Sequence, residues 1–108
     1  MFDRIRRHAA GWPDAPQLVG IFGSAARRDG GDDSDIDLVV VSDATDASEN
    51  GAALAANVER WTGNATHVIT VGSRDLRRMR RAREAVLAEW ERDLVVIAGR
   101  RDALRAAS

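Results

Sequence analysis

The chain has 108 residues, of which 44% are hydrophobic and 31% charged, and its formal net charge is -1 at pH 7. This size suits one modest hydrophobic core, so we expect a single domain over residues 1–108 with its core at about 17–99. The chain has no cysteine, which excludes disulfides, thiolate metal sites and a cysteine nucleophile, and its balanced charge argues against a long nucleic-acid substrate.

The N-terminus lacks the apolar core of a signal peptide, and no apolar run approaches the ~18 residues of a membrane span. We therefore expect a cytoplasmic protein that does not enter a membrane. Apolar residues at helical spacing predict a short helix over 2–9, which the two prolines after it end. Two partly β-branched apolar runs, 18–22 and 36–41, predict buried strands, and the stretch 25–34 between them has turn composition.

The second half of the chain continues the alternation of helix and strand. A polar loop is expected over 42–50, followed by an amphipathic helix from Ala52 that ends at Gly63. The β-branched run 66–71 predicts a third strand.

One long helix is expected to follow, capped by Ser73 and carrying apolar residues on one face as far as Trp90. The run 94–98 predicts a fourth strand, and 100–108 a basic, alanine-rich tail. The whole predicts an α/β (α+β) domain with a mixed four-stranded sheet and helices packed on it.

The long helix predicted from Ser73 carries a run of basic residues. The tryptophan of this helix and the tryptophan of the helix predicted before it are both expected in the core. We interpret the basic run mainly as a solvated face paired with nearby glutamates, while contact with RNA or an acidic partner stays open. The residues concerned are Arg77, Arg78, Arg80, Arg81 and Arg83 with Glu84, Glu89 and Glu91, and the tryptophans Trp61 and Trp90.

Two aspartates open the second strand. Because side chains alternate across a strand, Asp35 and Asp37 project from the same face, about 6.6 Å apart along the backbone. Ile36 and Leu38 point to the opposite, apolar face. Two adjacent carboxylates repel, and a hard divalent cation such as Mg²⁺, itself bound to phosphates, relieves that repulsion. The pattern therefore predicts a metal and nucleoside triphosphate site.

The end of the first strand supplies the other half of this site. Gly23 permits close approach of the backbone to a phosphate, and the Ser24 hydroxyl with nearby amides donates to anionic oxygens. Arg27 or Arg28 adds charge-assisted contacts. Asp43 and Asp75 lie beyond strand ends and are not assigned to the site.

This pattern resembles the minimal nucleotidyltransferases of the DNA polymerase β superfamily. The resemblance rests on Gly23-Ser24-Ala25-Ala26-Arg27, on Ser34-Asp35-Ile36-Asp37-Leu38, and on a closing helix, strand and glycine over 89–99. It implies that Gly23 and Ser24 hold the triphosphate, that Asp35 and Asp37 ligate Mg²⁺, and that a nucleoside monophosphate is transferred with release of pyrophosphate.

The chain departs from the family at one position. Active members carry a third carboxylate on the next core strand, and here His67 takes that place. His67 is either a general base or unusual metal ligand, since imidazole accepts protons near neutral pH, or a strand residue without a chemical task.

The small size resembles antitoxin-type members paired with HEPN-family toxins. That resemblance implies AMP transfer from ATP to a toxin hydroxyl, for example of a tyrosine. The alternative is a catalytically impaired binding module that neutralises or scaffolds a partner by contact, which the missing acid favours. An antibiotic-modifying nucleotidyltransferase ranks last, because such enzymes have an additional helical domain for the acceptor.

Overall fold

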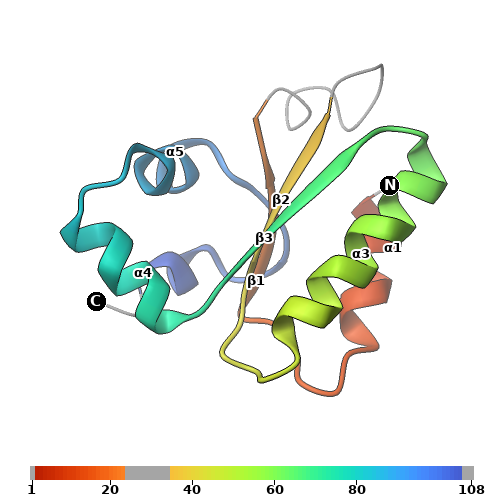
Figure 1. Ribbon diagram of the computed structural model, residues 1–108, viewed down its shortest axis with the longest axis horizontal. Helices are drawn as coiled ribbons and strands as arrows, with labels where there is room; N and C mark the ends of the chain where they lie inside the picture. The colour runs from red at the N-terminus through yellow and green to blue at the C-terminus, as the bar shows by residue number, and fades with distance from the viewer. Residues whose placement is uncertain (1, 24–34, 106–108) are drawn as a thin grey trace.

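The computed structural model describes residues 2–23 and 35–105. In it, a sheet with strand order β3-β2-β1-β4 lies between two helical layers (Figure 1). Helices α1 and α3 cover one face, and α4, α5 and η1 cover the other. The elements are α1 (Phe2–Ala10), β1 (Leu18–Phe22), β2 (Ile36–Val41), α3 (Ala47–Thr62), β3 (Thr66–Val71), α4 (Ser73–Arg81), α5 (Ala85–Asp93), β4 (Val95–Gly99) and the 3₁₀ helix η1 (Arg101–Leu104).

The sheet is mixed, as the sequence predicts. Strand β1 pairs antiparallel with both β2 and β4, whereas β2 and β3 are parallel and are connected through α3. Apart from Asp37, the residues of the two central strands are buried on both faces, which explains why these sequences are mainly apolar and do not alternate with polar residues. The expected α+β class with four strands is confirmed.

The sheet separates two hydrophobic cores. The core under α1 and α3 contains Ile5, Leu54 and Val58 together with the sheet residues on that face. The core under α4 and α5 is closed by Trp90, which has no exposed surface, and by Leu104. Alternate residues of each central strand supply the two cores, so the sheet cannot shift by one residue without exposing both. None of the helices in 2–23 and 35–105 is both long and apolar enough to cross a membrane.

Helix α3 begins at Ala47, so the loop predicted over 42–50 is wrong at its C-terminal end. Asn50 and Gly51 are typical of turns, but here they lie in the helix. Gly51 is buried, and a Cβ at this position would lie 2.6 Å from Thr70 Oγ1 of β3. The close contact between helix and strand requires glycine, and this tertiary packing outweighs the low helix propensity of the residue.

The single long helix predicted from Ser73 to Trp90 is also wrong, because the structure has two helices with a break at Arg83. Arg83 has φ +53°, in the left-handed region that residues other than glycine rarely adopt. Arg83 N–H donates to Arg80 O and Glu84 N–H to Met79 O, which together form a Schellman motif. The sequence does not indicate this helix end, because arginine occupies the position after the C-cap, where glycine is usual.

The tail predicted over 100–108 is partly structured. Within it, η1 buries Ala103 and Leu104 in the core beneath α4 and α5. Arg101 donates to the carbonyl oxygen of Leu94 and Arg80 to that of Leu104, so guanidinium groups fasten this segment to both helices. The two buried side chains were too few to predict an element from sequence.

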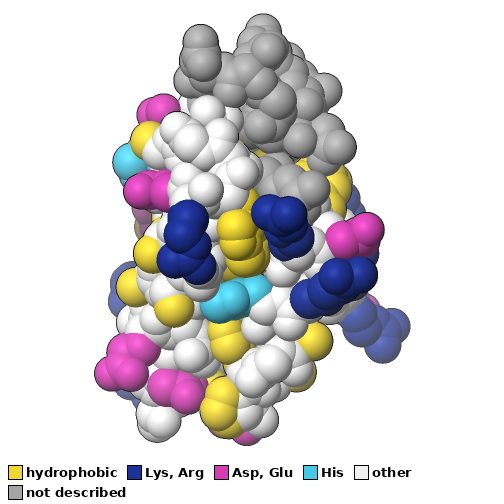
Figure 2. Space-filling model, turned by 90° about the vertical axis from the view of Figure 1, so that its right-hand side faces the viewer, with side chains coloured by type: hydrophobic (Ala, Val, Ile, Leu, Met, Phe, Trp, Pro, Cys, Tyr) yellow, Lys and Arg dark blue, Asp and Glu magenta, His cyan; other side chains and the backbone are white. Residues whose placement is uncertain are grey.

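The expectation that both tryptophans belong to the core is correct for Trp90, whereas Trp61 is half-buried and packs against the edge of the core under α1 and α3. Trp61 lies at the outer surface between α1 and α3, with the Arg4 guanidinium 5.7 Å from its ring centroid. Figure 2 shows this face of the molecule, on which basic side chains gather around a histidine and hydrophobic surface.

Helix α4 is fixed to the end of β2 by a carboxylate. Asp43, which follows β2, accepts hydrogen bonds from Ser73 N–H at 2.7 Å and Ser73 Oγ at 2.6 Å. Asp75 accepts from Gly72 N–H at 2.9 Å. The cap predicted for Ser73 is therefore supplied by Asp43, from 30 residues away. These hydrogen bonds lower the pKa of both carboxyl groups, that of Asp43 chiefly through Ser73 and that of Asp75 chiefly through Gly72.

We expect Asp43→Ala to lower the free energy of unfolding by about 1 kcal/mol at pH 7, the usual loss for a helix cap. A carboxyl whose folded pKa is lowered stabilises above its unfolded pKa of about 3.9, and this contribution is lost as pH falls through the folded pKa. Urea denaturation at pH 7 and pH 3 should therefore show a difference from the parent that shrinks at pH 3. Asp14→Ala, at an exposed loop position, is the control. An equal difference at both pH values would contradict the prediction.

We expect Arg83→Gly to raise the free energy of unfolding by about 0.5–1 kcal/mol, because glycine adopts positive φ without the Cβ penalty. Arg83→Ala keeps that penalty and removes the same guanidinium, so it should not stabilise. Chemical denaturation of the parent and the two variants distinguishes the backbone effect from the charge effect. Equal stability of the Gly and Ala variants would contradict the predicted backbone effect.

Candidate active site

Four of the predicted site residues meet at one end of the sheet. Gly23 follows β1, Asp35 directly precedes β2, and Asp37 and His67 are the second residues of β2 and β3. Strand β1 runs antiparallel to β2, and β3 runs parallel to β2, so the C-terminal end of β1 and the N-terminal ends of β2 and β3 lie at the same end of the sheet. This end is at the top of Figure 1. Ser24, Arg27 and Arg28, also predicted for the site, lie outside the described residues.

Asp37 is at the centre of this group. Its register partners are Phe22 on β1 and His67 on β3, so the three side chains lie in a row on one face of the sheet. Asp35 projects from the same face one pleat earlier. The pKa of Asp37 is raised, chiefly by its partial burial; the charge of His67 opposes this shift and that of Asp35 adds to it. A carboxylate that lies beside a second carboxylate is stabilised by a cation that binds to both of them.

His67 lies beside the aspartates and not on the opposite face. Its Nε2 is 3.8 Å from Asp35 Oδ2, and the two side chains are 63% and 64% exposed. The imidazole is therefore open to a substrate that approaches the carboxylates. This placement leaves a chemical role for His67 available.

Gly23 brings the backbone against the central carboxylate. It has φ +75°, and a Cβ built on it would lie 3.0 Å from Asp37 Oδ2. A larger residue would be strained by its φ and would crowd the oxygen atom that faces the site. Glycine at this position leaves space for a ligand next to Asp37.

The site is supported from below by two aromatic rings. Phe22 is 9% exposed, and its ring lies 5.6 Å from that of Trp90 in an edge-to-face arrangement. Trp90 belongs to α5, so this contact joins the strand that precedes Gly23 to the helical layer. This aromatic packing holds the end of β1, and with it the side chains beside Asp37, in place.

Sequence reasoning missed one exposed residue of this face. Ile69 is 40% exposed and projects from the same face of β3 as His67, two residues further along. His67 and Ile69 are the exposed residues of β3, and the β-branched run 66–71 predicted a strand without indicating which of its faces is exposed. Ile69 provides apolar surface next to the polar site. Asp43 and Asp75 lie at the other end of the sheet, which agrees with leaving them out.

The donor set fits a divalent cation that is held mainly by its substrate. Within residues 2–23 and 35–105, no three His, Asp or Glu side chains form a group that encloses a metal ion. Asp35 and Asp37 alone supply two carboxylates on one face. Mg²⁺ is commonly bound by one or two carboxylates, with water and phosphate oxygens completing its ligands. The two aspartates suit that kind of site and not a closed, all-protein one.

Similar structures come from toxin–antitoxin systems. A crystal structure of a toxin–antitoxin with AMP-PNP has a TM-score of 0.68 at 16% identity, covering 98% of this chain and 79% of the other. A toxin–antitoxin MntA–HpeT mutant with two aspartate-to-glutamate substitutions gives 0.69 at 14%, covering 99% and 80%. A tyrosine-to-alanine mutant of MntA–HpeT gives 0.62 at 16%, covering 97% and 77%. At these identities the likeness shows a shared fold. No curated protein matches the sequence.

The family profile described as polymerase beta, nucleotidyltransferase matches residues 12–98, which contain the candidate site, β1, β2, β3 and all but the last residue of β4. The resemblance inferred from Gly23 and the Asp35-Ile36-Asp37 pattern is thereby confirmed. The chain belongs to the polymerase β nucleotidyltransferase family.

Proposed function

We propose that this protein is a cytoplasmic, Mg²⁺-dependent nucleotidyltransferase that transfers AMP from ATP to a hydroxyl group of a HEPN-type partner toxin. One observation carries the proposal. Asp35, Asp37 and His67 lie on one face at one end of the sheet, next to the open backbone at Gly23, in a chain of the nucleotidyltransferase family.

The two aspartates and Gly23 would bind the nucleotide. Asp35 and Asp37 would hold Mg²⁺ together with the triphosphate, and Gly23 would let phosphate oxygens approach the backbone beside Asp37. When bound, the cation supplies positive charge that offsets the charge of the phosphates and the departing pyrophosphate. The exposed face of Ile69 would border the bound substrate on the β3 side.

His67 would act on the acceptor. In the transfer, the acceptor oxygen would form a bond to the α-phosphorus, the bond between that phosphorus and the α,β-bridging oxygen would break, and pyrophosphate would leave with that oxygen. The hydroxyl proton would pass to His67 Nε2, which lies 3.8 Å from Asp35 Oδ2 and is open to solvent. This arrangement replaces the third carboxylate of the family by a neutral base.

The choice of partner is supported by the similar structures, which are toxin–antitoxin assemblies, one of them with an ATP analogue. The substituted aspartates and tyrosine in two of them are the residue types that this mechanism needs for metal binding and for the acceptor. We infer by analogy that the acceptor here is a tyrosine hydroxyl of the toxin.

Asp35→Asn and Asp37→Asn should each reduce label transfer from α-³²P-ATP to the purified partner toxin by more than about 100-fold, because even outer-shell partners of a metal contribute 10–100-fold. Asp14→Asn removes the same charge from an exposed loop and should leave transfer unchanged. The assay needs Mg²⁺, and EDTA should abolish the signal.

The same experiment separates catalysis from neutralisation by contact. The lack of a third acid favours a module that only binds, and such a module would form the toxin complex without any transfer of label. A stable complex with no detectable transfer by the parent protein would overturn the enzymatic proposal.

His67→Ala should lower kcat by about 100-fold or more, the usual contribution of a general base, with a smaller change in KM for ATP. His67→Asp, which restores the residue type of the family, should recover part of the lost rate. Unchanged kcat in His67→Ala would show that the histidine has no chemical task.

A further inference from the structure

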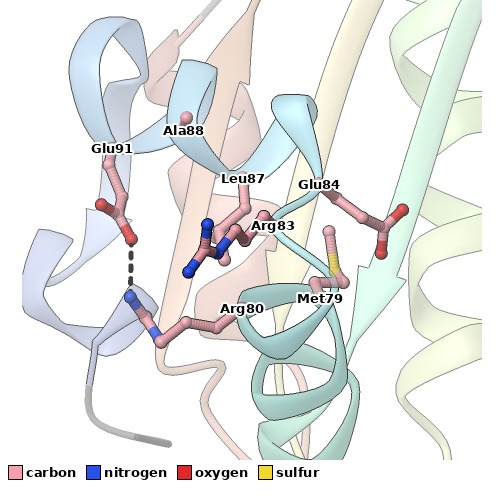
Figure 3. A pocket seen from close by; sticks show the side chains of 7 residues that line it. All are labelled: Met79, Arg80, Arg83, Glu84, Leu87, Ala88 and Glu91. Carbon is pink, nitrogen blue, oxygen red and sulfur yellow. Dashed lines mark hydrogen bonds and ion pairs between the residues drawn. The ribbon is translucent and has the colours of Figure 1, made fainter.

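The turn between α4 and α5 presents a group of basic side chains that the proposed reaction does not use. Arg77, Arg80, Arg81 and Arg83, here termed the arginine corner, line a hollow of about 450 Å³. Arg80 and Arg83 also line an adjoining hollow of about 200 Å³, shown in Figure 3, whose other lining residues are Met79, Glu84, Leu87, Ala88 and Glu91. The corner thus combines positive charge with apolar surface.

Two of these four arginines interact with carboxylates of the described residues, and two do not. Arg80 is held inward, with Nη1 3.1 Å from Glu91 Oε1 and Nη2 2.5 Å from Leu104 O. Arg77 interacts with the charge of Asp43. Arg81 and Arg83 have no ion-pair partner in 2–23 and 35–105, and the pairing expected with Glu84 and Glu89 is not found there.

The backbone of Arg83 is in a strained conformation. Its φ of +53° is that of the residue after a helix C-cap, where glycine is normally the least strained choice. A non-glycine residue in this region costs about 1–2 kcal/mol. Strain of this kind is a reason to look for a function of the side chain, and here the side chain is a guanidinium between the two hollows.

We propose that the arginine corner docks an acidic, amphipathic segment of the partner protein. Carboxylates of that segment would pair with Arg81 and Arg83, since guanidinium binds carboxylate through two parallel hydrogen bonds. An apolar side chain next to them would rest on Met79 and Leu87 between α4 and α5.

The corner fits an acidic protein segment better than a nucleic acid. Among residues 2–23 and 35–105, no aromatic side chain lines either hollow to stack on a base. The protein also has a net charge of -1, without the basic excess that drives binding to long polyanions.

The corner is separate from the row of Asp35, Asp37 and His67. It is formed by the helices and their turn, whereas the row lies at the starts of β2 and β3. The identity of the partner rests on the proposed function, but docking at this corner does not depend on turnover.

The test measures binding of the purified partner toxin to the full chain by isothermal titration calorimetry. Arg81→Glu/Arg83→Glu should weaken binding by at least about 10-fold and reduce its dependence on salt. Arg60→Glu, a charge reversal on the exposed surface of α3 in the opposite layer, is the control and should bind as the parent does. Asp35→Asn should also bind as the parent does while losing transfer.

Arg83→Gly gives the sharpest comparison, because it should stabilise the fold yet weaken binding several-fold. A loss of binding in a more stable protein cannot come from misfolding. Parent-like affinity in both corner variants would overturn this inference and leave the proposed function intact. No binding of the toxin by the parent would overturn both. Tighter binding of a single-stranded RNA oligonucleotide than of the toxin, lost in the same variants, would assign the corner to nucleic acid instead.

Discussion

The parallel register of β2 and β3 is the constraint on which the candidate site depends. It sets His67 opposite Asp37, while the antiparallel register of β1 sets Phe22 on the other side of the same aspartate. A slip of one residue on β3 would turn the imidazole to the α3 face and bring Val68 into the row. The burial of alternate strand residues in two separate cores prevents such a slip, so packing far from the site fixes its geometry.

The two helical layers have different tasks in this arrangement. Helices α1 and α3 cover one whole face with apolar side chains. Helices α4 and α5 cover only part of the other face: Trp90 supports Phe22 below the polar row, and Ile69 and His67 stay exposed beyond them. The open area beside the carboxylates is therefore a consequence of where this layer ends. The same layer presents the arginine corner, which gives one side of the molecule both the site and a charged surface.

Much of the fold was available from local sequence. The strands over 18–22 and 36–41 matched closely, because a buried central strand is a short apolar run whatever its neighbours are. The common face of Asp35 and Asp37 followed from alternation alone. Where the prediction failed, tertiary packing had overridden local preference: at Gly51 the helix lies so close to Thr70 that there is no room for a Cβ, and Leu104 belongs to a helical turn that completes a core.

By itself the sequence determined the family pattern, the paired carboxylates and the need for glycine at position 23, since each of these depends on residue type and close spacing. Only the tertiary structure decided that His67 faces Asp35 and that the helix predicted to run to Trp90 is broken at Arg83. The first depends on residues distant along the chain, and the second on a positive φ that an arginine in the sequence does not indicate. Register between strands and strain at a turn are properties of the assembled fold, so local patterns cannot reveal them.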